Sequence, residues 1–132
     1  MITELDATPE PSGELALQTV AMPKDTNASG DIFGGWLVSQ MDIAGAIAAS
    51  KLARGRVATV AIDRMSFMIP VKVGSVVSCF TEILNVGRSS IEVQIEVWMK
   101  QPNQSEVQKV TEGVFVFVAL DAQGKTRAVN KQ

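Results

Sequence analysis

Histidine is absent from this chain of 132 residues. Without it there is no Ser-His-Asp triad, no Cys-His pair and no histidine-ligated metal. The single cysteine, Cys79, excludes an intrachain disulfide and a multi-cysteine zinc site. Cys79 has apolar neighbours, so we expect a small core residue there. If this protein performs acid–base chemistry, a carboxylate is the leading candidate to carry it.

Several other features are missing as well. The net charge of −2 shows no basic excess, which argues against nonspecific nucleic-acid binding. No run of about 18 apolar residues is long enough to span a membrane, and the acidic N-terminus lacks the pattern of a signal peptide. Neither GxGxxG after a strand nor GxxxxGK[ST] occurs, so a nucleotide-binding loop has no support. We therefore expect a soluble, cytoplasmic protein with no nucleic-acid or membrane partner.

What the sequence does contain is typical of one globular domain. Apolar residues make up 46 % and charged residues 20 % of the chain. Residues 1–13 are polar and broken by two prolines and a glycine, which predicts a flexible tail. The remainder, residues 14–132, is expected to form a single domain that begins with a short edge strand from Leu15 to Met22.

One hydrophobic helix is predicted, followed only by strands. Residues 36–52 have no polar stripe on a helical wheel, which is typical of a buried helix, and Gly55 is its expected stop. Extended segments are predicted at 57–62, 64–69, 75–86, 90–100 and 106–120. Short turns after 86, 100 and 120 favour antiparallel neighbours. The pattern predicts an α+β fold in which a long antiparallel meander forms a curved sheet wrapped around the helix.

Asp42 stands in the middle of the apolar helix. Its neighbours one turn away include no cation, so no salt bridge within the helix accounts for it. The carboxylate must either leave water or face a cleft, which is costly without a purpose. Gly45, one turn further on, costs about 1 kcal/mol relative to alanine, which indicates that something packs or binds close to the backbone. A solvent-facing aspartate is the alternative interpretation.

The loop before the helix offers further polar groups. Gly34 and Gly35 at a helix N-terminus leave backbone N–H groups free, and these suit a carbonyl oxygen that gains negative charge. Asn27 can orient a water molecule or a carbonyl without titrating. Turn formation or helix capping is the alternative role for Asn27 and Asp31, and residue type alone favours it.

A long block carries a resemblance to a known family. Residues 22–36, MPKDTNASGDIFGGW, continue to Gln40-Met41-Asp42 and Gly45, and together they resemble the acyl-CoA thioesterases of the hotdog fold, in particular the YciA-like enzymes. Gly55-Arg56-Val57, Thr59-Val60-Ala61 and Gly87-Arg88-Ser89-Ser90 are further matches. The resemblance covers about residues 15–128.

The resemblance implies a function and assigns roles to residues. It implies hydrolysis of acyl-CoA to a carboxylic acid and free CoA, with no cofactor and no metal. It implies a homodimer joined sheet edge to sheet edge, in a tetramer or hexamer, with the active site between subunits. Asp42 of one subunit is the general base or nucleophile, Asn27 comes from the other, and the N–H groups of Gly34 and Gly35 hold the oxyanion. Five residues are expected to contact CoA: Arg56, Gly87, Arg88, Ser89 and Ser90. Arg54 and Lys72 are further candidates for its phosphates, and solvated surface charge is the alternative for each cation.

The sequence gives less support to two other functions. A hotdog dehydratase relies on a histidine that this chain lacks. A noncatalytic acyl-CoA binding or sensing module has no need of a carboxylate beside a thioester, so Asp42 favours the enzyme.

Overall fold

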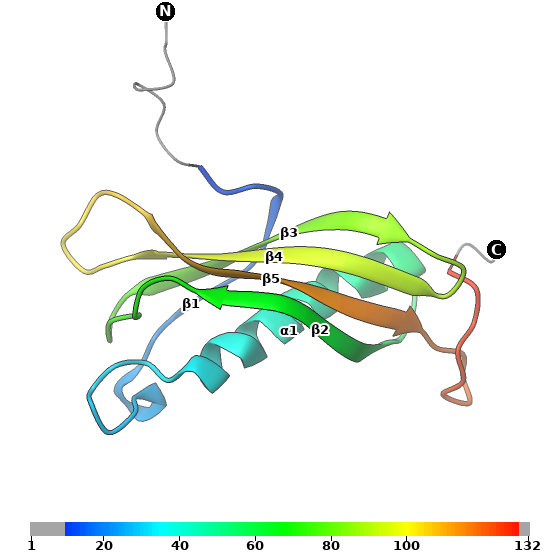
Figure 1. The fold of residues 1–132 in the computed structure, drawn as a ribbon, viewed down its shortest axis with the longest axis horizontal. Helices are drawn as coiled ribbons and strands as arrows, with labels where there is room; N and C mark the ends of the chain where they lie inside the picture. The colour runs from blue at the N-terminus through cyan, green and yellow to red at the C-terminus, as the bar shows by residue number, and fades with distance from the viewer. Residues whose placement is uncertain (1–9, 130–132) are drawn as a thin grey trace, which may run out of the picture.

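A computed structural model describes residues 10–129 of the chain, folded as one helix against a five-stranded sheet (Figure 1). The elements in chain order are β1 (Glu14–Val20), the short 3-10 helix η2 (Pro23–Asp25), α1 (Gly34–Ala53), β2 (Val57–Phe67), β3 (Val76–Val86), β4 (Ser90–Lys100) and β5 (Gln108–Ala119). The predicted helix and all the predicted extended segments are confirmed, with bounds that differ by a few residues. No helix in this part of the chain is long and apolar enough to cross a membrane.

The strand order is β1-β3-β4-β5-β2, and every neighbouring pair is antiparallel. The meander predicted for everything after the helix is therefore right for β3, β4 and β5 and wrong for β2, which lies at the far edge beside β5. The chain crosses from that edge to β3 through residues 68–75, a connection too long for a tight hairpin. One sheet edge is thus formed by β1 and the other by β2.

The strand β2 runs unbroken where two segments were predicted. Its pairing with β5 shifts register between Thr59 and Ala61 and again between Asp63 and Met65. Arg64 sits at the second irregularity with φ of 48°, the left-handed region that non-glycine residues seldom adopt. The bulge breaks the alternation of side chains, which is why the sequence pattern suggested a new strand there.

The core lies between one face of α1 and the inner face of the sheet. Six helix residues are buried on this face: Leu37, Met41, Ala44, Gly45, Ala49 and Ala53. A Cβ atom on Gly45 would lie 2.8 Å from both Ile95 Cδ1 and Phe117 Cζ. Glycine is thus needed for the close approach of helix and sheet, and the prediction that something packs against the backbone there is confirmed.

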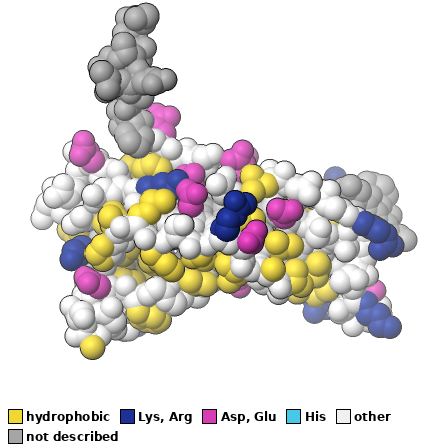
Figure 2. All heavy atoms as spheres, in the orientation of Figure 1, with side chains coloured by type: hydrophobic (Ala, Val, Ile, Leu, Met, Phe, Trp, Pro, Cys, Tyr) yellow, Lys and Arg dark blue, Asp and Glu magenta, His cyan; other side chains and the backbone are white. Residues whose placement is uncertain are grey.

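The flank of α1 beside β2 remains uncovered in this single chain. Ile43 and Ile47 are nearly half exposed, as is Ile62 on β2. Figure 2 shows hydrophobic side chains gathered in a band on the face where β2 and α1 lie in Figure 1. The prediction of a helix buried on all sides is therefore wrong for the single chain. Its sheet-facing side is buried, whereas its flank is apolar and open.

The predicted flexible tail over residues 1–13 falls mostly outside the described residues. Within its described part, the Ser12 backbone N–H donates to Glu96 Oε1 at 3.1 Å, and the Ser12 hydroxyl donates to Glu82 Oε1 at 2.8 Å. Residue 12 is thereby attached to the outer face of the sheet, the face that α1 does not cover.

Candidate active site

Asp42 projects from the open flank of α1 toward β2. The hydroxyl of Thr59, on the inner face of β2, donates to Asp42 Oδ1 at 2.6 Å. Asp42 is half-buried, and among residues 10–129 it makes no ion pair and its second oxygen has no hydrogen-bond partner. One oxygen is therefore fixed by Thr59, and the other is available to a water molecule or a substrate.

A hollow of about 420 Å³ extends from Asp42 along the helix. Its apolar wall includes Ile43, Ala46 and Ile47, and Arg56 lines it together with Asp42. Arg56 follows the C-terminus of α1, whereas Asp42 lies near its middle. Of the alternatives open for Asp42, the structure supports a carboxylate that faces an open hollow, and that hollow is lined by a carboxylate and a guanidinium.

Asn27 lies in the loop between η2 and α1, and its side chain closes that loop. Its Oδ1 accepts from the backbone N–H groups of Ser29 at 2.9 Å and Asp31 at 3.1 Å. The turn-forming role that residue type favoured is therefore present. The amide NH₂ has no partner among the described residues and is exposed, so it remains able to donate to a ligand.

Two carboxylates attach this loop to its surroundings. Asp25 is buried, and its Oδ2 accepts from the backbone N–H of Met22. Asp31 pairs with Lys72 at 3.3 Å. Lys72 was one candidate for a CoA phosphate, but the structure places it against the Asn27 loop, where it is paired with Asp31.

Gly34 and Gly35 form the first residues of α1 and are exposed. The N-cap residue is Phe33, and no side chain caps the helix. Within residues 10–129 the N–H groups of Gly34 and Gly35 have no hydrogen-bond partner. The predicted pair of free donors at the positive end of the helix dipole is therefore in place.

These donors are too far from Asp42 to share a substrate carbonyl within one chain. An attacking group and the oxyanion donors must each lie about 3 Å from the reacting group. Gly35 precedes Asp42 by almost two helical turns, roughly 10 Å along the axis. A single chain thus holds both kinds of group without bringing them together.

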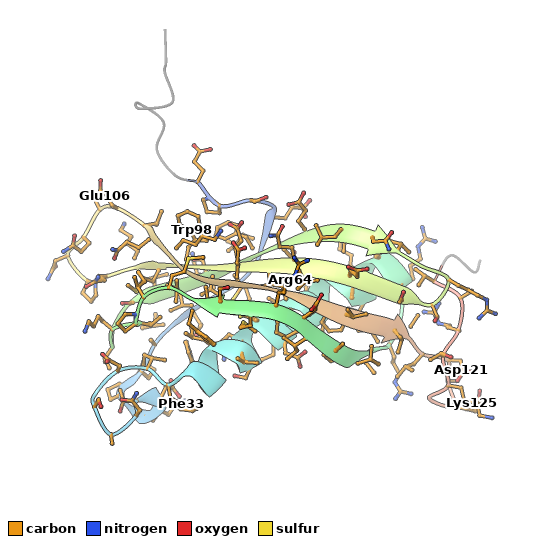
Figure 3. All side chains as sticks on the ribbon, in the orientation of Figure 1. Phe33, Arg64, Trp98, Glu106, Asp121 and Lys125 are labelled. Atoms are coloured by element: carbon orange, nitrogen blue, oxygen red, sulfur yellow. The ribbon has the colours of Figure 1, made fainter. Side chains whose placement is uncertain are left out.

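The residues expected to contact CoA lie at the opposite end of the molecule from Asn27. The turn of residues 87–90 joins β3 to β4, and Ser89 and Arg88 accept backbone hydrogen bonds from Ala119 and Val129. Arg54 and Arg56 lie near it, in a hollow that also includes Asp121. In Figure 3 Phe33, at the start of α1, and Asp121 mark the two ends. Arg54, Arg56 and Arg88 are exposed, and none makes an ion pair among the described residues.

Cys79 plays no part in this site. It is fully buried in β3, which confirms the predicted core residue, and burial raises its pKa to about 12. Its thiol is therefore protonated at neutral pH and is no nucleophile. No group of three or more Cys, Asp or Glu side chains within residues 10–129 is arranged to hold a metal ion.

Thr59 is the residue that sequence reasoning missed. It was noted only as part of a matching segment and was given no role. The polar Thr59 within the otherwise apolar run of residues 57–62 was the available signal, but the register shift after Thr59 made its face uncertain from sequence.

Comparison with known proteins identifies the group to which the chain is similar. The profile of the Thioesterase superfamily matches residues 29–106. The acyl-CoA thioester hydrolase YciA of Escherichia coli is 51 % identical over 90 % of this chain and 92 % of its own length. The Salmonella typhimurium protein of the same name is 50 % identical over 99 % of both chains.

Solved structures of thioesterases have the same fold as this chain. A hexameric thioesterase from Yersinia pestis has a TM-score of 0.89 at 53 % identity, covering 93 % of this chain and all of that one. The acyl-CoA hydrolase of Staphylococcus aureus, in complex with butyryl-CoA and CoA, has a TM-score of 0.79 at 29 % identity over 85 % of this chain and 68 % of that one. The predicted hotdog fold is confirmed, and this chain belongs to the thioesterase superfamily, among the acyl-CoA thioester hydrolases related to YciA.

Proposed function

We propose that this protein hydrolyses the thioester of acyl-CoA, giving a carboxylic acid and free CoA. The observation that carries the proposal is the Asp42–Thr59 pair, a carboxylate held by one hydroxyl and facing a hollow with no cation bonded to it. Such a carboxylate is available to react. Its setting in a chain about 50 % identical to acyl-CoA thioester hydrolases selects the thioester as its target.

Two subunits are needed to assemble this site. The N–H groups of Gly34 and Gly35 lie roughly 10 Å along the helix from Asp42, so the donors that face Asp42 must come from a second chain. A two-fold axis beside the open flank of α1 places the helix start of one subunit, with its Asn27 loop, near the middle of the other. Asp42 then serves one side of the thioester, while Asn27, Gly34 and Gly35 of the partner serve the other.

Variants of a relative support the choice of these residues. The S. aureus acyl-CoA hydrolase has been crystallised with an asparagine, an aspartate or a threonine replaced by alanine. Those three positions follow one another at the same spacing as Asn27, Asp42 and Thr59 do here. Thr59 therefore joins the proposed site as the residue that orients the carboxylate.

The chemistry requires that Asp42 end each turnover as it began. As a general base it takes a proton from water, whose oxygen adds to the carbonyl carbon. As a nucleophile it forms an acyl anhydride that water then cleaves. In either case the C–S bond breaks, the thiolate leaves as CoA and is protonated, and the N–H groups of Gly34 and Gly35 stabilise the oxyanion. We leave both routes open. Single-turnover hydrolysis in ¹⁸O-water distinguishes the general-base route from a nucleophilic route in which water attacks the aspartyl carbonyl of the anhydride, because only that nucleophilic route transfers an unlabelled Asp42 oxygen to the first product.

The CoA arm is proposed to follow the hollow from Asp42 to Arg56. The hollow is apolar along the helix and ends at the cation Arg56. The phosphates of CoA lie far from its thioester and need such a cation as their partner. Arg88, with Gly87, Ser89 and Ser90 in the same turn, extends the site beyond Arg56. We propose a homodimer as the catalytic unit and, since similar proteins are hexameric, a hexamer built from three such dimers. The cytoplasmic location stays a prediction.

The proposal is tested by hydrolysis of a panel of acyl-CoAs, with free CoA detected by a thiol reagent. We expect the wild type to hydrolyse acyl-CoA. In Asp42→Asn, kcat should fall by about 10²–10⁴, which is the usual contribution of a positioned general base. Asp63→Asn, on the exposed outer face, is the matched control and should retain wild-type activity. Turnover by Asp42→Asn near the wild-type rate would refute the mechanism. Binding of acyl-CoA without hydrolysis by the wild type would favour the noncatalytic module.

A further inference from the structure

We infer that the acyl chain enters the apolar pocket between the start of α1 and the end of β2, and that Phe67 and Met68 set the preference for chain length. The inference rests on the proposed function. It extends it by naming the part of the molecule that distinguishes a short acyl group from a long one.

The pocket adjoins the proposed oxyanion donors. It has a volume of about 340 Å³, within the range of small-molecule sites, roughly 300–1,000 Å³. Gly34 is one of its lining residues, and a Cβ atom on Gly34 would lie 3.6 Å from the Phe67 ring. A thioester whose oxygen is held by the Gly34 and Gly35 N–H groups thus has its carbonyl carbon at the mouth of this pocket. The acyl chain begins at that carbon.

The lining of the pocket suits a hydrocarbon. Every lining residue is apolar: Ile32, Gly34, Leu37, Phe67, Met68, Ile69, Pro70 and Val71. Ile32, Leu37 and Val71 are buried and form its floor. Four other hollows on the described surface each include at least one charged side chain. An alkyl chain is therefore better accommodated here than in those hollows, because it requires no desolvation of a charge.

Charge also fixes which way the substrate lies. From the thioester, the hollow beside Asp42 leads to Arg56, a partner for phosphate. The pocket beside the partner's helix start contains no cation and leads to Phe67 and Met68. The two ends of the substrate therefore separate onto two subunits, with CoA along the Asp42 chain and the acyl group in the chain that donates Gly34.

Phe67 and Met68 form the exposed rim of the pocket. Met68 is 49 % exposed and Phe67 is 53 % exposed. An acyl chain that fills the pocket must contact both side chains along its length, whereas an acetyl group meets only the edge of the Phe67 ring beside Gly34. Changes here should therefore reduce long-chain turnover much more than acetyl-CoA turnover.

The test measures kcat/KM for straight-chain acyl-CoAs from acetyl to lauroyl. We expect the wild-type value to rise by up to about fourfold for each methylene buried, the equivalent of about 0.8 kcal/mol, until the pocket is filled. Phe67→Ala and Met68→Glu should reduce that rise to about twofold or less per methylene, with a much smaller loss for acetyl-CoA than for the long chains. Leu84→Ala and Leu84→Glu are the controls, since Leu84 is 48 % exposed and lies on the outer face.

The outcomes separate the two proposals. A wild type that hydrolyses acyl-CoA, with both rim variants showing the wild-type dependence on chain length, overturns this inference and leaves the proposed function intact. Loss of acetyl-CoA and long-chain turnover in equal proportion, together with loss of the dimer, also overturns it, because the rim would then be a subunit contact. A wild type that hydrolyses no acyl-CoA removes the proposed function itself.

Discussion

The two sides of helix α1 both carry apolar residues but have opposite surroundings. On the sheet side, Gly45 lies so close to Ile95 and Phe117 that a methyl group would collide with both. On the flank beside β2, Ile43 and Ile47 are nearly half exposed around Asp42. One side is closed within the chain. The other is a surface that we propose a second chain completes.

This contrast shows why a hydrophobic helix is not by itself a core helix. An apolar residue that packs within the chain and one that packs against a partner satisfy the same hydrophobic requirement. The carboxylate makes the difference visible, because a charge is tolerated where water or substrate enters and is costly in a closed core. Each of the following substitutions changes either one side of the helix or the hydrogen bond between its flank and β2.

The largest effect is expected from Ile47→Asp on the open flank. An unpaired carboxylate buried between two subunits costs about 3 kcal/mol or more. The dissociation constant of the dimer should therefore rise at least about a hundredfold, and activity should fall as the dimer is lost. Analytical ultracentrifugation and acyl-CoA hydrolysis measure the two effects. Val107→Asp is the matched control, because Val107 is 45 % exposed against 44 % for Ile47 and lies just before β5, away from the helix. An intact dimer in Ile47→Asp would show that this flank is not the interface.

A smaller effect is expected from Thr59→Val, which removes the hydrogen bond from the Thr59 hydroxyl to the Asp42 carboxylate. A bond to a charged group is worth about 1.5–3 kcal/mol, so kcat should fall by about 10- to 150-fold, with the fold unchanged. Thr59→Ser keeps the hydroxyl and should restore most of the rate. Equal activity of the valine and serine variants would remove Thr59 from the site.

The smallest effect is expected from Gly45→Ala on the closed side, and it is one of stability. Alanine raises helix propensity by about 1 kcal/mol, but overpacking against Ile95 and Phe117 costs about 1–3 kcal/mol. Urea denaturation should therefore show a lower free energy of unfolding, by up to about 2 kcal/mol. Gly34→Ala is the control for stability, because its methyl group meets the Phe67 ring at an ordinary 3.6 Å. A Gly45→Ala variant more stable than the wild type would contradict the tight packing.

Local sequence patterns were enough to predict the helix and the strands. They did not predict how the strands pair, because pairing depends on contacts between residues that are far apart in the sequence. Nearly strict alternation from Ser90 to Lys100 and the apolar run around Phe115 were enough to predict β4 and β5. The position of β2 was not predictable in this way. It pairs with β5, some fifty residues later in the chain, and its bulge at Arg64 makes one strand resemble two.

The site was predictable where a residue stood out against its surroundings. Asp42 and the paired glycines differ from their neighbours in charge or in backbone freedom, and the structure places Asp42 at an open hollow and the glycines at the predicted helix start. Thr59 and Lys72 do not stand out in the sequence. The first acts through a contact across two elements, and the second is held by Asp31, a partner far away in the chain.

The central claim is that each site is shared between two subunits, and mixing two inactive variants tests it most directly. Asp42→Ala and Asn27→Ala are purified, mixed in equal amounts, dissociated and reassembled. If the site is shared, about a quarter of wild-type activity returns, because half the dimers are mixed and each mixed dimer contains one intact site out of two. If Asp42 and Asn27 act from the same chain, no mixed dimer contains an intact site. The activity then stays at the level of the separate variants, which would contradict the account.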